Sequence, residues 1–250
     1  MFTKLIVCNN VSGAGYTTLL WQLVRDKVIV LGPPQFTTRF LRPSEKHGEE
    51  YYSVPQEVLL VISNQIAIAS SFGSTFYGYF LPAIHQIHRR LLTQNVIIYS
   101  TNLPFEWKTL MGPSVPIVSL FFAPSSPFIC AQRIILRDFQ DGNMFLEYLL
   151  KRVEFNKSYI ALVECFDYWI DTTIAEMIFP AVKDFICAET TRSSLTMTRN
   201  VKRIPDNWYE ISTLVQSFRN SSETLIQMLS KISKHPRNLS KEELLSKLSG

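Results

Sequence analysis

The sequence is poor in cysteine and contains no C-x-x-C pair. Its four cysteines, Cys8, Cys130, Cys165 and Cys187, are widely spaced, and three of them lie in apolar runs. A structural zinc site or a disulfide framework is therefore not expected, and a reducing compartment is the default.

Long hydrophobic runs are also missing. No apolar run approaches the roughly 20 residues that a membrane-spanning helix needs. The first residues, M-F-T-K, lead directly into a strand-like segment without the apolar region and cleavage site of a secretory leader. No spacing indicates a Ser-His-Asp or Cys-His arrangement, so hydrolase chemistry is not favoured. We expect a cytoplasmic protein without a transmembrane segment.

The net charge of +4 is unevenly distributed. Residues 191–250 carry ten Lys and Arg against five acids, whereas the first 190 residues are close to neutral. Such a basic C-terminal extension can bind an anionic partner, although a solvated helical appendage explains the same pattern. With 250 residues and 46% hydrophobic content, the rest can bury one substantial core.

Apolar strand-like runs alternate with helical patterns along residues 1–190. Strands are predicted at 4–8, 27–31, 51–54, 66–72, 96–99, 115–122 and 168–171, and helices at 17–25, 55–64, 80–93, 126–139, 143–164 and 174–188. This order predicts an α/β fold with a parallel sheet flanked by helices. The strands near 50–72 indicate a small antiparallel insertion. We place a soft boundary near residue 191, followed by a mostly helical extension.

Residues 10–17, N-V-S-G-A-G-Y-T, resemble a phosphate-binding loop of the pattern G-x-x-x-x-G-K-[ST]. An apolar run precedes them and a helical pattern follows, so the loop would point ligand phosphates at a helix N-terminus. Gly15 and Thr17 fit the pattern, while Asn10 replaces the first glycine and Tyr16 replaces the lysine. A βα turn that binds nothing is the alternative. The donor-nucleotide candidates are Ser12, Gly13, Ala14, Gly15, Tyr16, Thr17 and Thr18, with Thr17 as the Mg²⁺ ligand.

A second segment, residues 37–54, has two arginines three apart followed by a tyrosine. Guanidinium groups bind the oxygens of a phosphomonoester in pairs, and a phenol adds one hydrogen bond. This segment resembles the guanylate kinase signature T-T-R-x-x-R-x-x-E-x-x-G-x-x-Y, and the later Tyr77-Gly78 resembles the Tyr-Gly of that family. The resemblance covers roughly residues 3–190. It implies a P-loop nucleoside monophosphate kinase fold, with the acceptor-binding insertion at about 35–80 and the lid at about 133–152.

The resemblance implies a set of binding residues that is only partly intact. The acceptor phosphate is assigned to Arg39, Arg42, Tyr51 and Tyr77, all of which are present. The guanine-reading positions fall on about Ile68, Gln35, Tyr79 and Thr101, none of which is a carboxylate. A base edge buried without partners costs about 1–3 kcal/mol per group, so guanine selectivity is not expected.

The donor side has also diverged. The acidic residues that end the corresponding strand of the family, and that help to organise Mg²⁺, are missing from residues 96–101. Three arginines, Arg133, Arg137 and Arg152, are assigned to the lid as catalytic cations, although a solvated helical face explains the same spacing.

Two functions therefore remain open. The first is a pseudokinase that binds a nucleotide, another phosphorylated small molecule or a phosphorylated protein partner, as guanylate kinase-like domains of membrane scaffold proteins do. The second is an active phosphotransferase that uses ATP and Mg²⁺ on GMP, dGMP or another monophosphate such as a ribose phosphate. We favour the first, because the losses are confined to the donor and base-reading sides.

Overall fold

The computed structural model describes residues 3–27, 29–42, 45–127, 129–131, 133–134, 152, 155–156, 158–173, 179–180 and 182–186. The extension expected at 191–250, Arg137 and most of the lid expected at 133–152 lie outside the described residues. Within the described part of the chain, no helix has the length and apolar character to cross a membrane.

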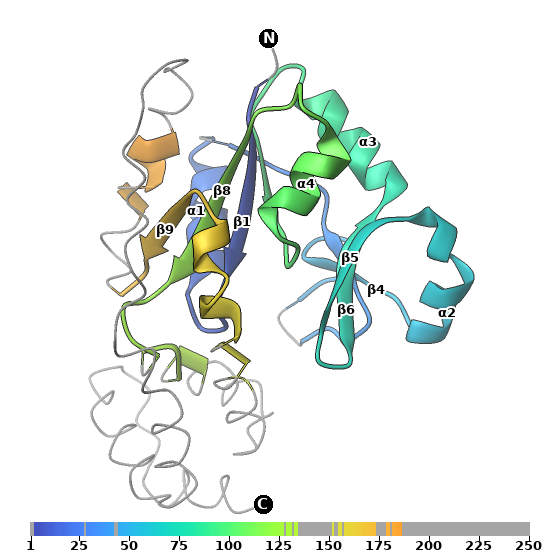
Figure 1. The fold of residues 1–250 in the computed structure, drawn as a ribbon, viewed down its shortest axis with the longest axis horizontal. Coiled ribbons are helices and arrows are strands. Elements are labelled where there is room, and N and C mark those ends of the chain that lie inside the picture. The colour runs from blue at the N-terminus through green and yellow to red at the C-terminus, as the bar shows by residue number, and fades with distance from the viewer. Residues whose placement is uncertain are drawn as a thin grey trace, which may run out of the picture.

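A five-stranded parallel sheet forms the centre of the molecule, in the order β2-β7-β1-β8-β9 (Figure 1). Its strands are β1 (Leu5–Asn10), β2 (Val30–Leu31), β7 (Val96–Tyr99), β8 (Ile117–Ala123) and β9 (Tyr168–Asp171). The parallel α/β class expected from the sequence is confirmed. Strand β1 lies between β7 and β8, in the middle of the sheet. The loop that follows it therefore opens near the middle of the carboxyl edge, where open α/β sheets bind ligands.

Alternate residues of the central strands point to two separate cores. Leu5 and Val7 of β1 belong to one buried cluster, and Ile6 and Cys8 belong to the other. This is the two-residue period of a strand buried on both faces, which explains why the first four residues of β1 are all apolar.

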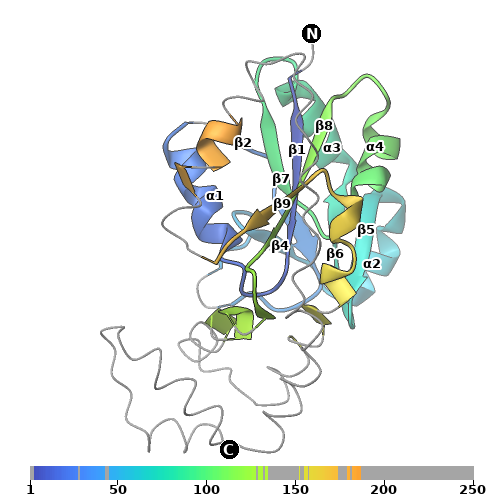
Figure 2. The same cartoon turned by 60° about the vertical axis from the view of Figure 1, so that its left-hand side comes forward.

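Helices cover both faces of this sheet. Helix α1 (Tyr16–Arg25) packs on one face with the helical residues 182–186, while α3 (Leu81–Arg90) and α4 (Pro104–Met111) pack on the other (Figure 2). Trp107 of α4 is fully buried, and its indole N–H donates to Ser100 Oγ at 2.7 Å. A 3₁₀ turn, η2 (Val163–Cys165), leads into β9.

A second, four-stranded sheet lies beside the first, in the order β4-β3-β6-β5. It consists of β3 (Gln35–Thr37), β4 (Tyr51–Ser53), β5 (Ile66–Phe72) and β6 (Thr75–Phe80). Helix α2 (Gln56–Val61) and the 3₁₀ turn η1 (Ser63–Gln65) connect β4 to β5. Strands β5 and β6 form a hairpin whose turn contains Gly73, at a φ of 59°. Figure 1 shows this sheet and α2 to one side of the central sheet.

The structure corrects the sequence interpretation of this region. The strands expected at 51–54 and 66–72 do not pair with each other, because β3 and β6 lie between them. Strands β3 and β4 run parallel, so the sheet is mixed and not simply antiparallel. Strands β3 and β6 and helix α4 were not expected. Strand β3 has only three residues, two of them polar, and α4 has only eight residues and begins with a proline, so neither gives a long periodic signal.

Gly78 on β6 is required by the close approach of its neighbours. A Cβ at this position would lie 2.2 Å from the carbonyl oxygen of Ile68 and 2.8 Å from the Phe36 ring. Backbone on one side and a buried ring on the other leave no room for a methyl group, so the second sheet depends on a glycine here.

We therefore expect Gly78→Ala to lower the free energy of unfolding by about 1–3 kcal/mol or more, as overpacking does. Chemical denaturation measures this change. The matched control is Ala69→Ser, at an exposed position opposite Gly78, for which a change within about 0.5 kcal/mol is expected. Equal stability of the two variants would show that the sheet can shift to accommodate the methyl group.

Candidate functional site

The turn between β1 and α1 has the geometry of a phosphate-binding loop. Gly13 and Gly15 adopt left-handed φ angles of 85° and 82°. A Cβ on Gly13 would also lie 2.5 Å from the carbonyl oxygen of Cys130, so only glycine fits there. The N-terminus of α1 therefore opens at this loop, where a helix dipole and unpaired N–H groups favour an anion.

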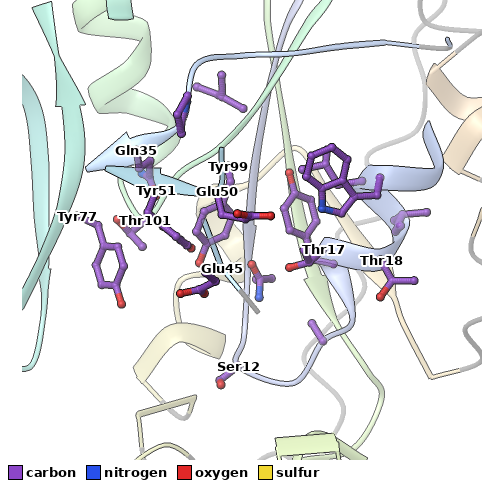
Figure 3. Close-up of a pocket in the computed structure, with 18 of the residues that line it drawn as sticks. Ser12, Thr17, Thr18, Gln35, Glu45, Glu50, Tyr51, Tyr77, Tyr99 and Thr101 are labelled. Atoms are coloured by element: carbon purple, nitrogen blue, oxygen red, sulfur yellow. The ribbon is translucent and has the colours of Figure 1, made fainter. Parts of the chain in front are cut away.

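All seven donor candidates, residues 12–18, line one pocket of about 900 Å³ that also contains the acceptor candidates. Figure 3 shows Thr17 and Thr18 on one side of this pocket and Gln35, Tyr51, Tyr77 and Thr101 on the other. Thr17 and Thr18 are exposed, so their hydroxyls are available to a ligand. The structure thus brings the two halves of the predicted site together.

Tyr16 does not act as a surface group at the loop, because its side chain is buried. Only 5% of the residue is exposed, and the ring packs against Phe122 and Tyr99 at centroid distances of 5.0 and 5.5 Å. Burial, together with the neighbouring Cys8 thiol, raises the pKa of the Tyr16 phenol well above its ordinary value. The phenol is therefore neutral, and the position that carries the P-loop lysine supplies no charge. It fills space beneath the loop and does not stack on a base.

Two of the three candidate lid arginines contact the loop. The Arg133 guanidinium donates to the carbonyl oxygens of Ala14, Thr172 and Thr173 at 3.2, 2.8 and 3.1 Å. This ties the loop to the segment that follows β9. Arg152 donates from Nη1 to Ser12 Oγ at 2.9 Å and lines the pocket. Arg137 lies outside the described residues.

Asn156 makes a contact with the loop that the sequence did not indicate. Its amide accepts the N–H of Ser12 at 2.8 Å and donates to the carbonyl of Ser12 at 3.0 Å. Asn156 is buried and stands four residues after Arg152, so one helical face carries both side chains. The backbone of Ser12 is thereby held by protein, and the N–H of Ala14 is also engaged, with the carbonyl oxygen of Val11 at 3.1 Å.

The acceptor candidates form a compact anion cradle around a carboxylate. Arg39 binds Glu45 through two hydrogen bonds of 2.6 and 2.7 Å and also donates to the Tyr77 hydroxyl at 3.2 Å. Arg42 donates to Glu45 from its backbone N–H at 2.9 Å and from its guanidinium at 3.2 Å. The guanidinium of Arg39 also lies over the Tyr51 ring, 4.9 Å from its centroid. The structure therefore brings all four predicted residues together and adds Glu45.

The cradle is partly buried, and this determines its charge. Burial alone raises the pKa of Glu45, but hydrogen bonds from Arg39 and from the backbone of Arg42 hold it below its ordinary value. Burial also raises the pKa of Tyr51 to about 12, an effect that the nearby Tyr77 reinforces and Arg39 opposes. At neutral pH the cradle consists of two cationic arginines, one carboxylate and a neutral Tyr51 phenol.

Aromatic rings close one edge of the pocket. Phe72 of β5 stacks on Phe155 at a centroid distance of 3.5 Å, and Tyr159 packs against both rings at 6.0 and 5.0 Å. Phe72 also meets the ring of Tyr77 at 6.5 Å. These contacts join the second sheet to the helical residues Phe155 and Tyr159, which pack in or against the core beside α1.

The pattern of these residues matches one known family. Residues 3–189 match the family model described as guanylate kinase. The chain belongs to the guanylate kinase family. The guanylate kinase of Anaplasma phagocytophilum (strain HZ) is 29% identical over 194 residues, covering 74% of this chain and 86% of that protein. The enzyme of Pasteurella multocida (strain Pm70) is 27% identical over 210 residues, covering 80% and 93%.

The family assignment extends to the fold. The crystal structure of guanylate kinase from Anaplasma phagocytophilum aligns with a TM-score of 0.55 at 21% identity, covering 77% of this chain and 88% of that one. The recognition drawn from residues 37–54 is therefore confirmed, as is the P-loop kinase architecture.

Guanylate kinases bind nucleotide substrates and use ATP and Mg²⁺. The donor half of the site can therefore be compared with the groups that bind nucleotide phosphates and Mg²⁺. The glycine geometry of the loop and the exposed Thr17 hydroxyl fit nucleotide phosphates and one metal ligand. No His, Cys, Asp or Glu cluster that could hold a metal occurs within the described ranges. The end of β7, where the acids of the family would stand, carries the buried side chains of Ser100, Thr101 and Asn102. The donor half thus fits a phosphate better than it fits a metal-nucleotide complex.

The side chains at the positions expected to bind guanine make other contacts. Ile68 packs against the core that contains α3 and α4. Tyr79 is buried edge-on against Trp107, and its hydroxyl donates to the carbonyl of Tyr99. Thr101 accepts a hydrogen bond from Ser70 Oγ, and Gln35 is buried at the pocket wall. No carboxylate occurs at these four positions.

Glu45 gives a pH-dependent test of the cradle. Because its folded-state pKa is lowered, its contribution to stability is complete above the ordinary pKa of 4.5 and is lost as the pH falls through the lowered value. We expect Glu45→Gln to cost about 1–3 kcal/mol at pH 7 and progressively less below about pH 4. Unfolding measured across this range tests it, with Glu49→Gln, at an exposed carboxylate, as the control. If the difference in unfolding free energy between Glu45→Gln and the unchanged protein is the same at every pH, the assignment of Glu45 to the cradle is contradicted.

Tyr16 gives a second test, because its buried hydroxyl has no oxygen or nitrogen partner among the described residues and contacts the Cys8 thiol, which bonds only weakly. Removing a hydroxyl held by so weak a bond costs little, so Tyr16→Phe should leave the melting temperature unchanged or raise it. Tyr79→Phe is the contrast, since the Tyr79 hydroxyl is hydrogen-bonded and its loss should cost about 0.5–1.5 kcal/mol. A marked loss of stability in Tyr16→Phe would mean that the hydroxyl has a structural role.

Proposed function

We propose that this member of the guanylate kinase family is a pseudokinase, which binds a nucleotide or another phosphorylated ligand through its acceptor cradle. The observation that carries the proposal is a contrast between the two halves of one pocket. Arg39, Arg42, Tyr51 and Tyr77 are assembled around a carboxylate at one end, whereas Tyr16 is a buried, neutral side chain at the other. A phosphomonoester can replace Glu45 on the two guanidinium groups.

Phosphoryl transfer depends mainly on positioning and on cancelling charge at the transferring group. The donor loop supplies no lysine, and Arg133 is engaged with three backbone carbonyls. Loss of one preorganised electrostatic group typically costs on the order of 10²–10³ in rate. Rate should therefore suffer more than binding in this chain.

An active phosphotransferase is the second candidate, and one contact favours it. The guanidinium of Arg152 lies at Ser12 Oγ, within the loop itself, where a cation can stand in for the missing lysine. In this case ATP would be the donor with Mg²⁺ at Thr17, and GMP, dGMP or another monophosphate such as a ribose phosphate would be the acceptor. Arg39 and Arg42 would hold the acceptor phosphate in either case.

The C-terminal extension, residues 191–250, forms part of the same proposal. Its excess of basic residues is suited to an anionic partner, and a phosphorylated protein is a ligand that the acceptor cradle would also accept. We place the boundary of the guanylate kinase-like domain near residue 190.

The test measures binding and turnover on the same preparation. We expect monophosphates to raise the melting temperature by mass action, and Arg39→Ala to weaken their binding at least tenfold, since a charged hydrogen-bonding group is lost. Arg89→Ala, an exposed arginine on α3, is the matched control and should bind as the unchanged protein does.

Turnover of ATP with GMP separates the two candidates. The pseudokinase proposal expects turnover far below the usual kinase range of about 1–100 s⁻¹. Turnover within that range would establish the phosphotransferase instead. Unchanged monophosphate binding in Arg39→Ala would remove the cradle from both candidates.

A further inference from the structure

The end of the pocket that holds the positions expected to bind guanine contains a buried side chain with unused hydrogen-bonding capacity. Gln35 on β3 is 2% exposed, and neither its amide nitrogen nor its amide oxygen has a partner among the described residues. The residue lines the pocket, and Figure 3 shows it near Tyr51 and Thr101, on the side away from Thr17. Buried amides are rarely left without partners, so such a group points to a ligand.

Three nearby hydroxyl groups are engaged with the protein. The hydroxyl of Tyr79 donates to the backbone of Tyr99, and the hydroxyls of Ser70 and Thr101 are bonded to each other. Ile68 offers only an apolar side chain, packed toward the other core. Gln35 therefore supplies the side-chain amide that is available to a base held above the cradle.

An amide has a specific hydrogen-bonding preference. Its oxygen accepts and its nitrogen donates, so it pairs with an edge that offers one donor beside one acceptor. Hypoxanthine, uracil and thymine have such an edge in adjacent N–H and C=O groups, and adenine and cytosine have one in an amino group beside a ring nitrogen. Guanine presents an additional 2-amino group beside N1–H, and these two adjacent donors suit a carboxylate.

We propose that this pocket selects nucleoside monophosphates whose base offers one donor beside one acceptor and lacks the 2-amino group of guanine, with Gln35 as the specificity-determining residue. The inference rests on the proposed function, because the cradle of Arg39 and Arg42 must hold the phosphate. Guanine paired to Gln35 through N1–H and O6 would need a further acceptor for its 2-amino group, which the amide of Gln35 cannot supply. The apolar Ile68 stands where the family has its glutamate.

The experiment compares ligands that share the phosphate and differ in the base. Isothermal titration of the full chain with IMP and GMP isolates the 2-amino group, the one difference between them. We expect IMP to bind about 5- to 150-fold more tightly than GMP, the range that corresponds to one unpaired buried polar group. UMP and AMP then distinguish bases with an N–H beside a C=O from bases with an amino group beside a ring nitrogen. Ribose 5-phosphate, which has no base, reports on the cradle alone.

Two variants test the role of Gln35 itself. Gln35→Glu supplies a carboxylate for two adjacent donors and should shift the preference toward GMP. Gln35→Met keeps the size of the side chain without its hydrogen bonds, and should reduce the advantage of IMP over ribose 5-phosphate. Binding of ribose 5-phosphate should be unchanged in both variants, which shows that the fold and the cradle are intact.

The possible outcomes separate this inference from the proposed function. GMP binding as tightly as IMP, or more tightly, would overturn the inference while leaving the cradle in place. Ribose 5-phosphate binding as tightly as every nucleotide would also overturn it, because the base would then contribute nothing. Binding of none of these ligands would contradict the proposed function itself.

Discussion

The bidentate ion pair between Arg39 and Glu45 holds the acceptor side of this protein together. It places the Arg39 guanidinium beside Tyr77 and Tyr51, and the same carboxylate also binds Arg42. Because the pair is largely shielded from water, breaking it without a replacement anion would leave buried charge uncompensated. A phosphate bound in the proposed cradle would be such a replacement.

The donor side depends on backbone geometry more than on charge. Two left-handed glycines and the close contact of Gly13 with Cys130 set the shape of the loop, and Arg133 and Asn156 fix its position from outside. The Tyr16 ring takes the place of the lysine and packs into the apolar core. The loop keeps the backbone shape of a phosphate site but lacks the P-loop lysine. This pattern is expected of a protein that binds a phosphate without transferring it.

Much of this could be predicted from the sequence, for physical reasons that differ between regions. The apolar runs of β1, β7 and β8 predicted buried strands, and the arginine motif identified the family because its residues and their spacing match the family signature. Strand β3 was missed because it has only three residues, and β6 because Gly78 interrupts its strand pattern. Glu45 lay within the motif, but nothing in the sequence showed that its carboxylate would occupy the cradle.

Other features could not have been derived from spacing. Asn156 contacts Ser12 across 144 positions of the chain, a pairing that only the folded structure brings about. The burial of Tyr16 depends on Phe122 and Tyr99, which reach it from two other strands. In each case the decisive partner is distant in sequence, and side-chain chemistry alone does not reveal it.

The stacked rings of Phe72, Phe155 and Tyr159 have a consequence for how a ligand would bind. They join the second sheet to the helical residues beside the phosphate loop, so the two walls of the pocket are in contact. A ligand would spend little of its binding free energy on drawing these walls together.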